Sequence, residues 1–425
     1  MNRWLSLAAA GALAMAPYPP ALGAENTVPV GSTLESLLVV ARQSNPDLQA
    51  MRYDAQAAGE RVVPAGSLSD PLFNMELRDV TNQASGAGTS LSPANVGSTR
   101  YQLRQAFLPW GQRDAKQGAA QAAADEATFR ANAAWTDLAM RVKTAYARWQ
   151  QLHAALVQMR ELLALNNRIE AVAQARYAGG LAPQQDPIRA QVERTAMVTD
   201  ILLTEAELVT TRARINGLLA RPPESHLATP IADAGIPLAA RLDLQTLRGR
   251  VLAHNPLIAA DEARLRAAEK KKDAVWSNRY PGFTFGVAPI QSGSRISEWE
   301  LMFEINIPLQ QGARRAEERE ALSMIAAAQA RKESTANDLV AQLGEQLSGL
   351  EAALQVESLT QKTLLPQTAM TLQAALSGYE SGKVDFATVM DAQRQVRQAQ
   401  LNLIRTRADA RVRLAEIERL LGDEL

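Results

Sequence analysis

Apolar and polar residues alternate with a period of two in four short segments of this chain. The pattern is clearest in the second half, where apolar side chains alternate with mostly acidic ones (Trp299, Leu301, Phe303, Ile305 and Ile307 against Glu298, Glu300, Glu304 and Asn306). Successive side chains of a β-strand point to opposite faces, so this pattern predicts a strand with one apolar and one polar face. Four strands are predicted in all, at about 71–79, 100–108, 282–290 and 298–308.

The length and surroundings of these strands bear on whether they cross a membrane. A tilted transmembrane strand needs about 9–11 residues, which matches the predicted segments. The stretch from Val80 to Ser98 is rich in Ser, Gly, Asn and Thr, as a long extracellular loop would be. An amphipathic sheet over a soluble core would show the same alternation, so the strands by themselves leave that alternative open.

A long helix is predicted after each pair of strands. Residues 112–176 contain no proline, and their apolar residues recur in steps of three and four (Val142, Ala145, Trp149, Leu152, Leu156, Met159 and Leu163). This spacing is typical of the heptad seam of a coiled coil. We therefore expect helical hairpins at about 112–220 and 312–421.

The far end of each hairpin is predicted from glycine. Gly180 and Gly382 each follow a long helical pattern, and glycine allows the left-handed conformation with which many helices end. In the second hairpin, Pro366 interrupts the first helix and is expected to bend it.

The two halves of the chain follow one plan. Landmark residues recur in the same order, at offsets of 210 and then 202 residues (Leu34, Leu37 and Asn45-Pro46 with Leu244, Leu247 and Asn255-Pro256; Tyr177, Gly180, Gln191 and Ile215 with Tyr379, Gly382, Gln393 and Ile417). Asparagine caps a helix and proline suits its first turn, so each Asn-Pro pair predicts a helix start. We predict repeats at 32–220 and 243–425, joined by a proline-rich linker at 221–242.

The composition excludes several classes of function. The 45 Lys and Arg residues balance 45 Asp and Glu residues, whereas nucleic-acid binding needs a basic excess. There is no cysteine, and the three histidines lie far apart, so neither disulfides nor thiolate or histidine metal sites are expected. No catalytic grouping or glycine-rich phosphate loop is present. We expect no nucleic-acid partner, no cofactor, no bound metal and no enzymatic activity.

The N-terminus has the features of an export signal. Arg3 precedes an apolar run that ends near Ala16, and small residues follow up to Ala24. This order predicts a signal peptide at 1–24. After it no apolar stretch of about 18 residues occurs, so no transmembrane helix is expected in the mature chain.

Four strands are too few to cross a membrane alone. The smallest spanning barrels have about eight strands, and an open edge in lipid would leave backbone groups unpaired. If the strands span, three chains would contribute about twelve strands to one barrel, with their polar faces lining the lumen. The predicted fold is therefore mostly α with a β part: coiled-coil hairpins forming an α-barrel below a trimeric 12-stranded transmembrane β-barrel.

These features resemble the TolC family of outer-membrane efflux channels over nearly the whole mature chain. The resemblance is carried by the Asn-Pro helix starts, the strand exits and the hairpin tips (Phe107-Leu108-Pro109-Trp110-Gly111 and Ile307-Pro308-Leu309-Gln310-Gln311-Gly312; Arg176-Tyr177-Ala178-Gly179-Gly180-Leu181 and Gly378-Tyr379-Glu380-Ser381-Gly382). It implies a homotrimer in outer-membrane lipid, with its helices in the periplasm. It also implies docking to a periplasmic adaptor (membrane fusion) protein and an inner-membrane RND transporter.

The first strand exit and the short C-terminus are similar to the channels of heavy-metal resistance pumps. This closer resemblance implies heavy-metal cations as cargo. Drug or solvent efflux and type I secretion are the alternatives within the family. A periplasmic coiled-coil adaptor or scaffold is an alternative from another class, which the duplicated strands disfavour, and a secreted enzyme is disfavoured by the lack of a site.

The resemblance further implies residues that close the periplasmic aperture. In the family, acids and a tyrosine near the tips hold it shut, and Asp186, Tyr379 and Asp391 match these positions. The alternative for each acid is an ordinary solvated helix residue, and Asp186 would also suit the start of a helix after Pro183.

The chain departs from the family pattern at two positions near the second tip. Thr388 stands where a first acid is expected, and Val384 where an arginine stands. Asp385 lies nearby and is the candidate to compensate. The family engages its adaptor through the tips, which implies contacts at Gly180, Leu181 and Gly382.

Overall fold

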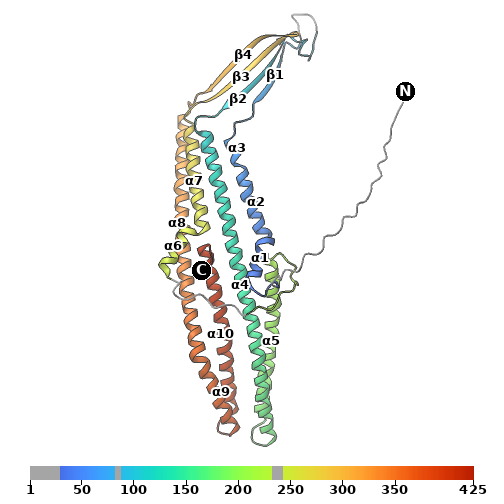
Figure 1. The fold of residues 1–425 in the computed structure, drawn as a ribbon, viewed down its shortest axis with the longest axis vertical. Helices are drawn as coiled ribbons and strands as arrows, with labels where there is room; N and C mark the ends of the chain where they lie inside the picture. Colours follow the sequence, from blue (N-terminus) through green and yellow to red (C-terminus); the bar gives the residue numbers. More distant parts are fainter. Residues whose placement is uncertain (1–28, 82–87, 232–242) are drawn as a thin grey trace, which may run out of the picture.

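The computed structural model describes residues 29–81, 88–231 and 243–425. The predicted signal peptide, part of the loop after Val80 and the second half of the predicted linker lie outside the described residues. The molecule is long and narrow, with a β-sheet at one end and two helical tips at the other (Figure 1).

Helices make up most of the molecule. In chain order, the helices and strands are α1 (Leu34–Ser44), α2 (Pro46–Glu60), α3 (Val62–Gly66), β1 (Leu72–Arg78), β2 (Ser98–Phe107), α4 (Gln112–Ala178), α5 (Gln185–Leu218), α6 (Leu244–His254), α7 (Pro256–Ser277), β3 (Gly282–Ser292), β4 (Arg295–Asn306), α8 (Gln311–Leu359), the π-helical turn η2 (Thr360–Leu364), α9 (Leu365–Glu380) and α10 (Phe386–Leu421). Each repeat therefore has two or three short helices, two strands and a long hairpin.

The four strands form one antiparallel sheet in the order β1-β2-β3-β4. The register places Phe73, Leu103, Val287 and Leu301 in one row across the sheet. Because side chains alternate along each strand, most of the large apolar residues of the four strands share one face and most charged residues share the other. β4 ends at Asn306, two residues before the predicted end and ahead of Pro308, which has no N–H for a ladder hydrogen bond.

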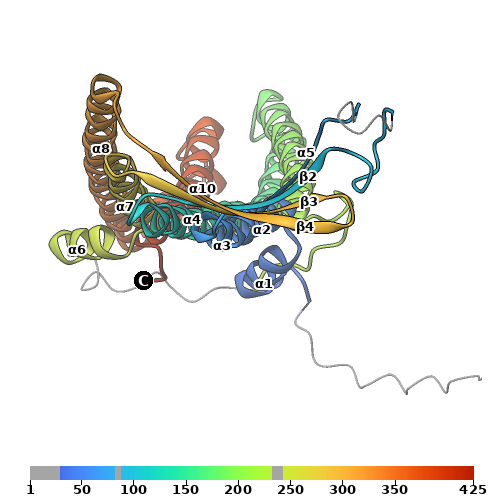
Figure 2. The ribbon, with the colours of Figure 1, turned by 90° about the horizontal axis from the view of Figure 1, so that it is seen from above.

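The long helices lie side by side in a single layer. Near the sheet the order is α2, α4, α7 and α8, and toward the tips α5 and α10 flank α4. Seen from above, α1 and α6 lie on one side of this layer, and the helices lean toward the opposite side as they approach the tips (Figure 2).

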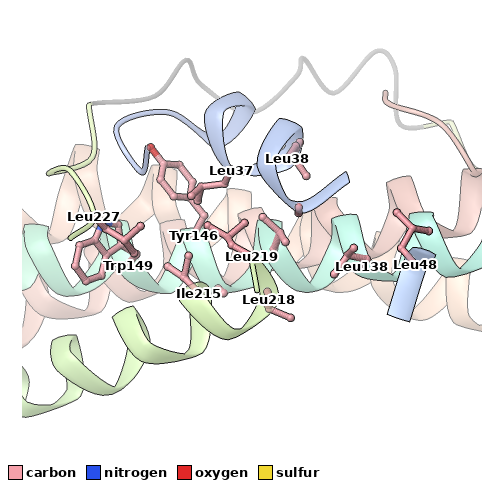
Figure 3. Packing of buried hydrophobic residues seen from close by; sticks show 13 residues of the cluster. Leu37, Leu38, Leu48, Leu138, Tyr146, Trp149, Ile215, Leu218, Leu219 and Leu227 are labelled. Atoms are coloured by element: carbon pink, nitrogen blue, oxygen red, sulfur yellow. The ribbon is translucent and has the colours of Figure 1, made fainter. Parts of the chain in front are cut away.

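Two equivalent cores lie near the middle of the molecule. In the first, Leu37 of α1 packs against Tyr146 and Trp149 of α4 and Ile215 at the end of α5 (Figure 3). The second repeat builds its core at matching positions of α6, α8 and α10 (Leu247, Val251, Leu343, Leu347, Ile417, Leu420 and Leu421). These are the apolar landmarks of the duplicated sequence.

Each Asn-Pro pair both starts a helix and fastens it to the hairpin. The Asn45 side chain accepts a hydrogen bond from Leu48 N at 3.0 Å and donates one to the carbonyl of Leu218, also at 3.0 Å. Asn255 accepts from Leu257 N and donates to the Leu420 carbonyl, both at 2.8 Å. Asparagine thus satisfies free groups at the start of one helix and at the end of another.

The predicted bend at Pro366 is a π-helical turn just before the proline. Residues 360–364 form η2, and α9 continues the helix toward the tip. Because proline cannot donate a hydrogen bond within a helix, a wider turn before it lets the chain continue. In the described parts of the chain, no helix is long and apolar enough to cross a membrane.

Candidate functional site at the hairpin tips

The two hairpin tips end their first helices in the same way. Gly180 and Gly382 both have positive φ, at 70° and 73°. The amide of Leu181 donates to the Arg176 carbonyl, and the amide of Lys383 donates to the Gly378 carbonyl, each at 2.8 Å. These six-to-one hydrogen bonds satisfy carbonyls at the helix ends and require a left-handed residue.

A shared core joins the two hairpins just above their tips. Ile169 and Ala173 of α4 and Ala190 of α5 pack with Tyr379 of α9 and Phe386 of α10. Four helices from both repeats therefore meet at the end of the molecule far from the sheet (Figure 1).

Tyr379 and Asp186 form a buried hydrogen bond between the hairpins. The phenol of Tyr379 donates to an Asp186 carboxylate oxygen at 3.0 Å, and the two residues are 4% and 5% exposed. Burial, together with the neighbouring Asp186 carboxylate, raises the pKa of Tyr379 to about 12. The phenol therefore remains a donor at any physiological pH.

Asp385 has a different position from the other acids, because it caps a helix. Its carboxylate accepts hydrogen bonds from Thr388 N at 3.0 Å and from the Thr388 hydroxyl at 2.5 Å. These bonds lower the pKa of Asp385 below its ordinary value. Thr388, which stands where an acid is expected, thus donates to the residue that caps α10.

Asp391 lies on the outside of the subunit. Its side chain is 65% exposed and pairs with Arg394, one turn along α10, at 3.1 Å. Arg394 also contacts Glu193 of α5 at 3.2 Å, and Arg397 contacts the same glutamate at 2.8 Å. The structure therefore brings Asp186 and Tyr379 together and leaves Asp391 at the surface.

The sequence and the geometry agree with one protein family. The sequence model of the outer membrane efflux protein family matches residues 37–221 and 247–423. The chain belongs to the outer membrane efflux protein family. It is thus an outer-membrane efflux channel protein and not an enzyme, and its helical part lies in the periplasm. The predicted family is confirmed, and the alternatives of an adaptor, a scaffold or a secreted enzyme are wrong.

Several solved outer-membrane proteins share the fold. CusC, studied for its folding and transmembrane channel formation, superposes with a TM-score of 0.79 at 18% identity, over 93% of this chain and 94% of its own. VceC from Vibrio cholerae superposes with a TM-score of 0.77 at 18% identity, over 92% of this chain and 96% of its own. The outer-membrane channel OprN superposes with a TM-score of 0.76 at 19% identity, over 92% of this chain and 89% of its own. No curated protein sequence matches this chain significantly. The predicted fold class of duplicated long hairpins and four strands is confirmed.

Two charged residues at the tips of this efflux protein were not expected from sequence. The Arg176 guanidinium lies over the Tyr379 ring, 4.8 Å from its centroid. Glu193 of α5 forms ion pairs with Arg394 and Arg397 of α10. The signal for Arg176 is an asymmetry between the repeats, because the position 202 residues later is Gly378. Glu193 has no comparable signal, since its partners lie about two hundred residues away in the chain.

Proposed function

We propose that the chain is the outer-membrane subunit of a tripartite efflux system. Three copies would form one passive exit duct for heavy-metal cations, driven by an inner-membrane RND pump through a periplasmic adaptor. The observation that carries this proposal is the sheet, which has two free edges, one exposed apolar face and one charged face.

The two faces of the sheet suit lipid on one side and water on the other. Phe73, Phe285 and Leu301 lie exposed on the apolar face, and Leu301 is 86% exposed. On the other face, Arg100 of β2 contacts Glu300 at 2.6 Å and Glu76 at 4.0 Å. Such an apolar surface favours a partner that excludes water, and lipid is the one available in the outer membrane.

The direction of the strands supports closure by further copies. Each strand is antiparallel to the next, so β1 and β4 run in opposite directions. β4 of one copy would therefore meet β1 of the next in an antiparallel pair, and the same step repeated three times gives twelve strands. Closure would pair the edges that cannot stay open in lipid.

The helical part also has two edges that a neighbouring copy would cover. The outer face of α5 carries a stripe of exposed apolar residues (Ile188, Val192, Leu202, Leu203 and Val209). The opposite edge, formed by α8, η2 and α9, carries another (Val356, Leu359, Leu364 and Met370). Two different apolar edges suit a head-to-tail contact, which closes into a ring when the rotation allows it.

The tips supply the proposed aperture and the proposed adaptor contact. Because the helices lean away from the side of α1 and α6 (Figure 2), three copies with that side outward would converge at the tips. We place Asp186, Tyr379, Asp385 and Asp391 at this aperture, and Gly180, Leu181 and Gly382 at the adaptor contact. Leu181 is 70% exposed, as a docking residue would be.

The cargo is proposed from the resemblance of the first strand exit to the channels of heavy-metal pumps. Among the residues that the structure describes, no group of three or more His, Cys, Asp and Glu side chains could hold a metal ion. A duct needs no such site, because tight binding would slow release.

The test of this function is deletion of the gene, followed by growth on a panel of metal salts and drugs. We expect tolerance of metal cations to fall and to return with a plasmid copy. Loss of drug tolerance alone would favour drug efflux, and unchanged tolerance of both would overturn the proposal. For the adaptor, a Leu181→Cys variant of this cysteine-free chain should crosslink to it in cells, and a second bulky change, Gly180→Trp, should abolish that crosslink.

A further inference from the structure

The Arg176 side chain connects the two tips of one subunit. It lies in the last turn of α4, in the first hairpin. One guanidinium nitrogen donates to the Glu380 carbonyl of the second tip at 2.6 Å, and another donates to the Leu181 carbonyl of its own tip at 3.3 Å. A single planar group thus holds the backbone of both turns.

The acceptor in the second tip is well suited to a cation. Glu380 is the last residue of α9, and the final carbonyls of a helix lack partners within it and carry partial negative charge. Arginine satisfies such a carbonyl and complements its charge at once. It also keeps donors free for a second acceptor, because its fork has five N–H groups.

The same guanidinium supports the Tyr379 ring. Its carbon lies 4.8 Å from the ring centroid, within the range of a cation–π contact. Phe386 packs 5.2 Å away, centroid to centroid, so the ring is held by a cation and an aromatic neighbour. This orientation directs the phenol to Asp186.

The second tip has no room for an equivalent residue. A side chain at Gly378, the matching position, would place its Cβ 2.2 Å from a methyl carbon of Val384. The second repeat therefore offers no equivalent of the Arg176 link, which acts beside the Tyr379–Asp186 hydrogen bond and the ion pairs of Glu193.

We propose that Arg176 is a positioning residue that locks the two tips of a subunit into one unit. The hairpins then shift together at the aperture, and Tyr379 stays aligned with Asp186 as they do so. The role at an aperture rests on the proposed function, whereas the coupling of the tips does not and is measured without transport.

The chain lacks cysteine, so the distance between tips can be measured with two added spin labels. We choose Gln184→Cys in the first tip and Lys383→Cys in the second, because both side chains are exposed. Labelled protein is assembled with an excess of unlabelled chain, so that distances come from one subunit. We expect one narrow distance peak for the parent and its loss, with a shift to longer distances, for Arg176→Gln.

Two further variants make the test specific. Arg176→Lys keeps the positive charge but lacks the planar guanidinium with its several donors, so it should retain part of the narrow peak that Arg176→Gln loses. Arg168→Gln removes an exposed arginine of the same helix for which the described residues show no ion pair or hydrogen bond, and it should leave the peak unchanged. Thermal unfolding midpoints of the variants should stay close together. A distance distribution in Arg176→Gln identical to that of Arg168→Gln would overturn the coupling.

The aperture is tested separately in cells. If the tips uncouple in Arg176→Gln and entry of a large excluded antibiotic rises, both the coupling and its role at the aperture are supported. If the tips uncouple without any rise, the coupling stands and the proposed aperture is overturned.

Discussion

Replacing Tyr379 with phenylalanine should open the proposed aperture. The change removes one hydroxyl and keeps the ring against Arg176 and Phe386. Asp186, which is 5% exposed, then loses the phenol that donates to it at 3.0 Å. A hydrogen bond to a charged group contributes about 1.5–3 kcal/mol.

We place the effect at the lower end of that range. Asp186 lies in the first turn of α5, so the free N–H groups of the helix start still stabilise its carboxylate in the variant. A loss of about 1.5 kcal/mol per subunit shifts the equilibrium between joined and separated tips roughly tenfold. With three copies in the ring, the effect on opening is larger still if all three must separate.

The measurement is the rate at which a large antibiotic, normally excluded, enters cells that express the variant. Tyr177→Phe is the matched control, because Tyr177 holds the same place in the first tip and is 45% exposed. We expect faster entry for Tyr379→Phe and no change for the control. Equal rates for the two variants, at equal protein levels in the outer membrane, would refute the reasoning.

Three further predictions concern the strands, the turns and pH. Leu301→Arg should impair assembly in the outer membrane, because arginine on a lipid face costs about 2–4 kcal/mol near mid-bilayer. Glu304→Arg, on the charged face, should assemble normally. Migration of the two variants on gels with and without heating measures assembly, and equal behaviour would mean that the two faces are wrongly assigned. Gly180→Ala should lower the midpoint of thermal unfolding, because the φ of 70° at this position costs a residue with a side chain roughly 1–2 kcal/mol. Gly179→Ala, at φ −81°, should leave the midpoint unchanged. A lower midpoint for Gly179→Ala than for Gly180→Ala, measured by calorimetry, would contradict this. Since the pKa of Tyr379 is raised to about 12, its contribution to stability should be complete below its ordinary pKa near 10 and fade as pH rises toward 12, so alkaline unfolding of Tyr379→Phe should depend less on pH than that of the parent.

The strands and hairpins were predictable because their patterns are local. Period-two alternation identified four strands, and heptad spacing identified the seams, whose residues Val142, Trp149 and Leu343 are buried. The register could not be predicted in the same way. It depends on pairing β2 with β3, which lie nearly two hundred residues apart.

The caps illustrate the same limit. Asparagine and proline at 45–46 indicated a helix start, but nothing local indicated that the Asn45 amide reaches the Leu218 carbonyl. Pro366 indicated a bend, while the π-helical form of the turn before it depends on how neighbouring helices hold the chain.

The tip site was predictable only in part. Family resemblance pointed to Asp186 and Tyr379, and the structure places them in contact. Asp385 was the candidate to compensate for the acid missing at Thr388, and its carboxylate caps α10. Arg176 was missed because its role arises from contacts with backbone carbonyls across the subunit, which the asymmetry between Arg176 and Gly378 does not by itself indicate.

The central claim is that three copies of this chain close one barrel and one duct. The mass of the intact assembly, released from detergent and measured by native mass spectrometry, tests it most directly. We predict a single species with the mass of three mature chains. A folded, membrane-extracted species with the mass of one chain would contradict the claim, because its four strands would then stand in lipid with both edges open.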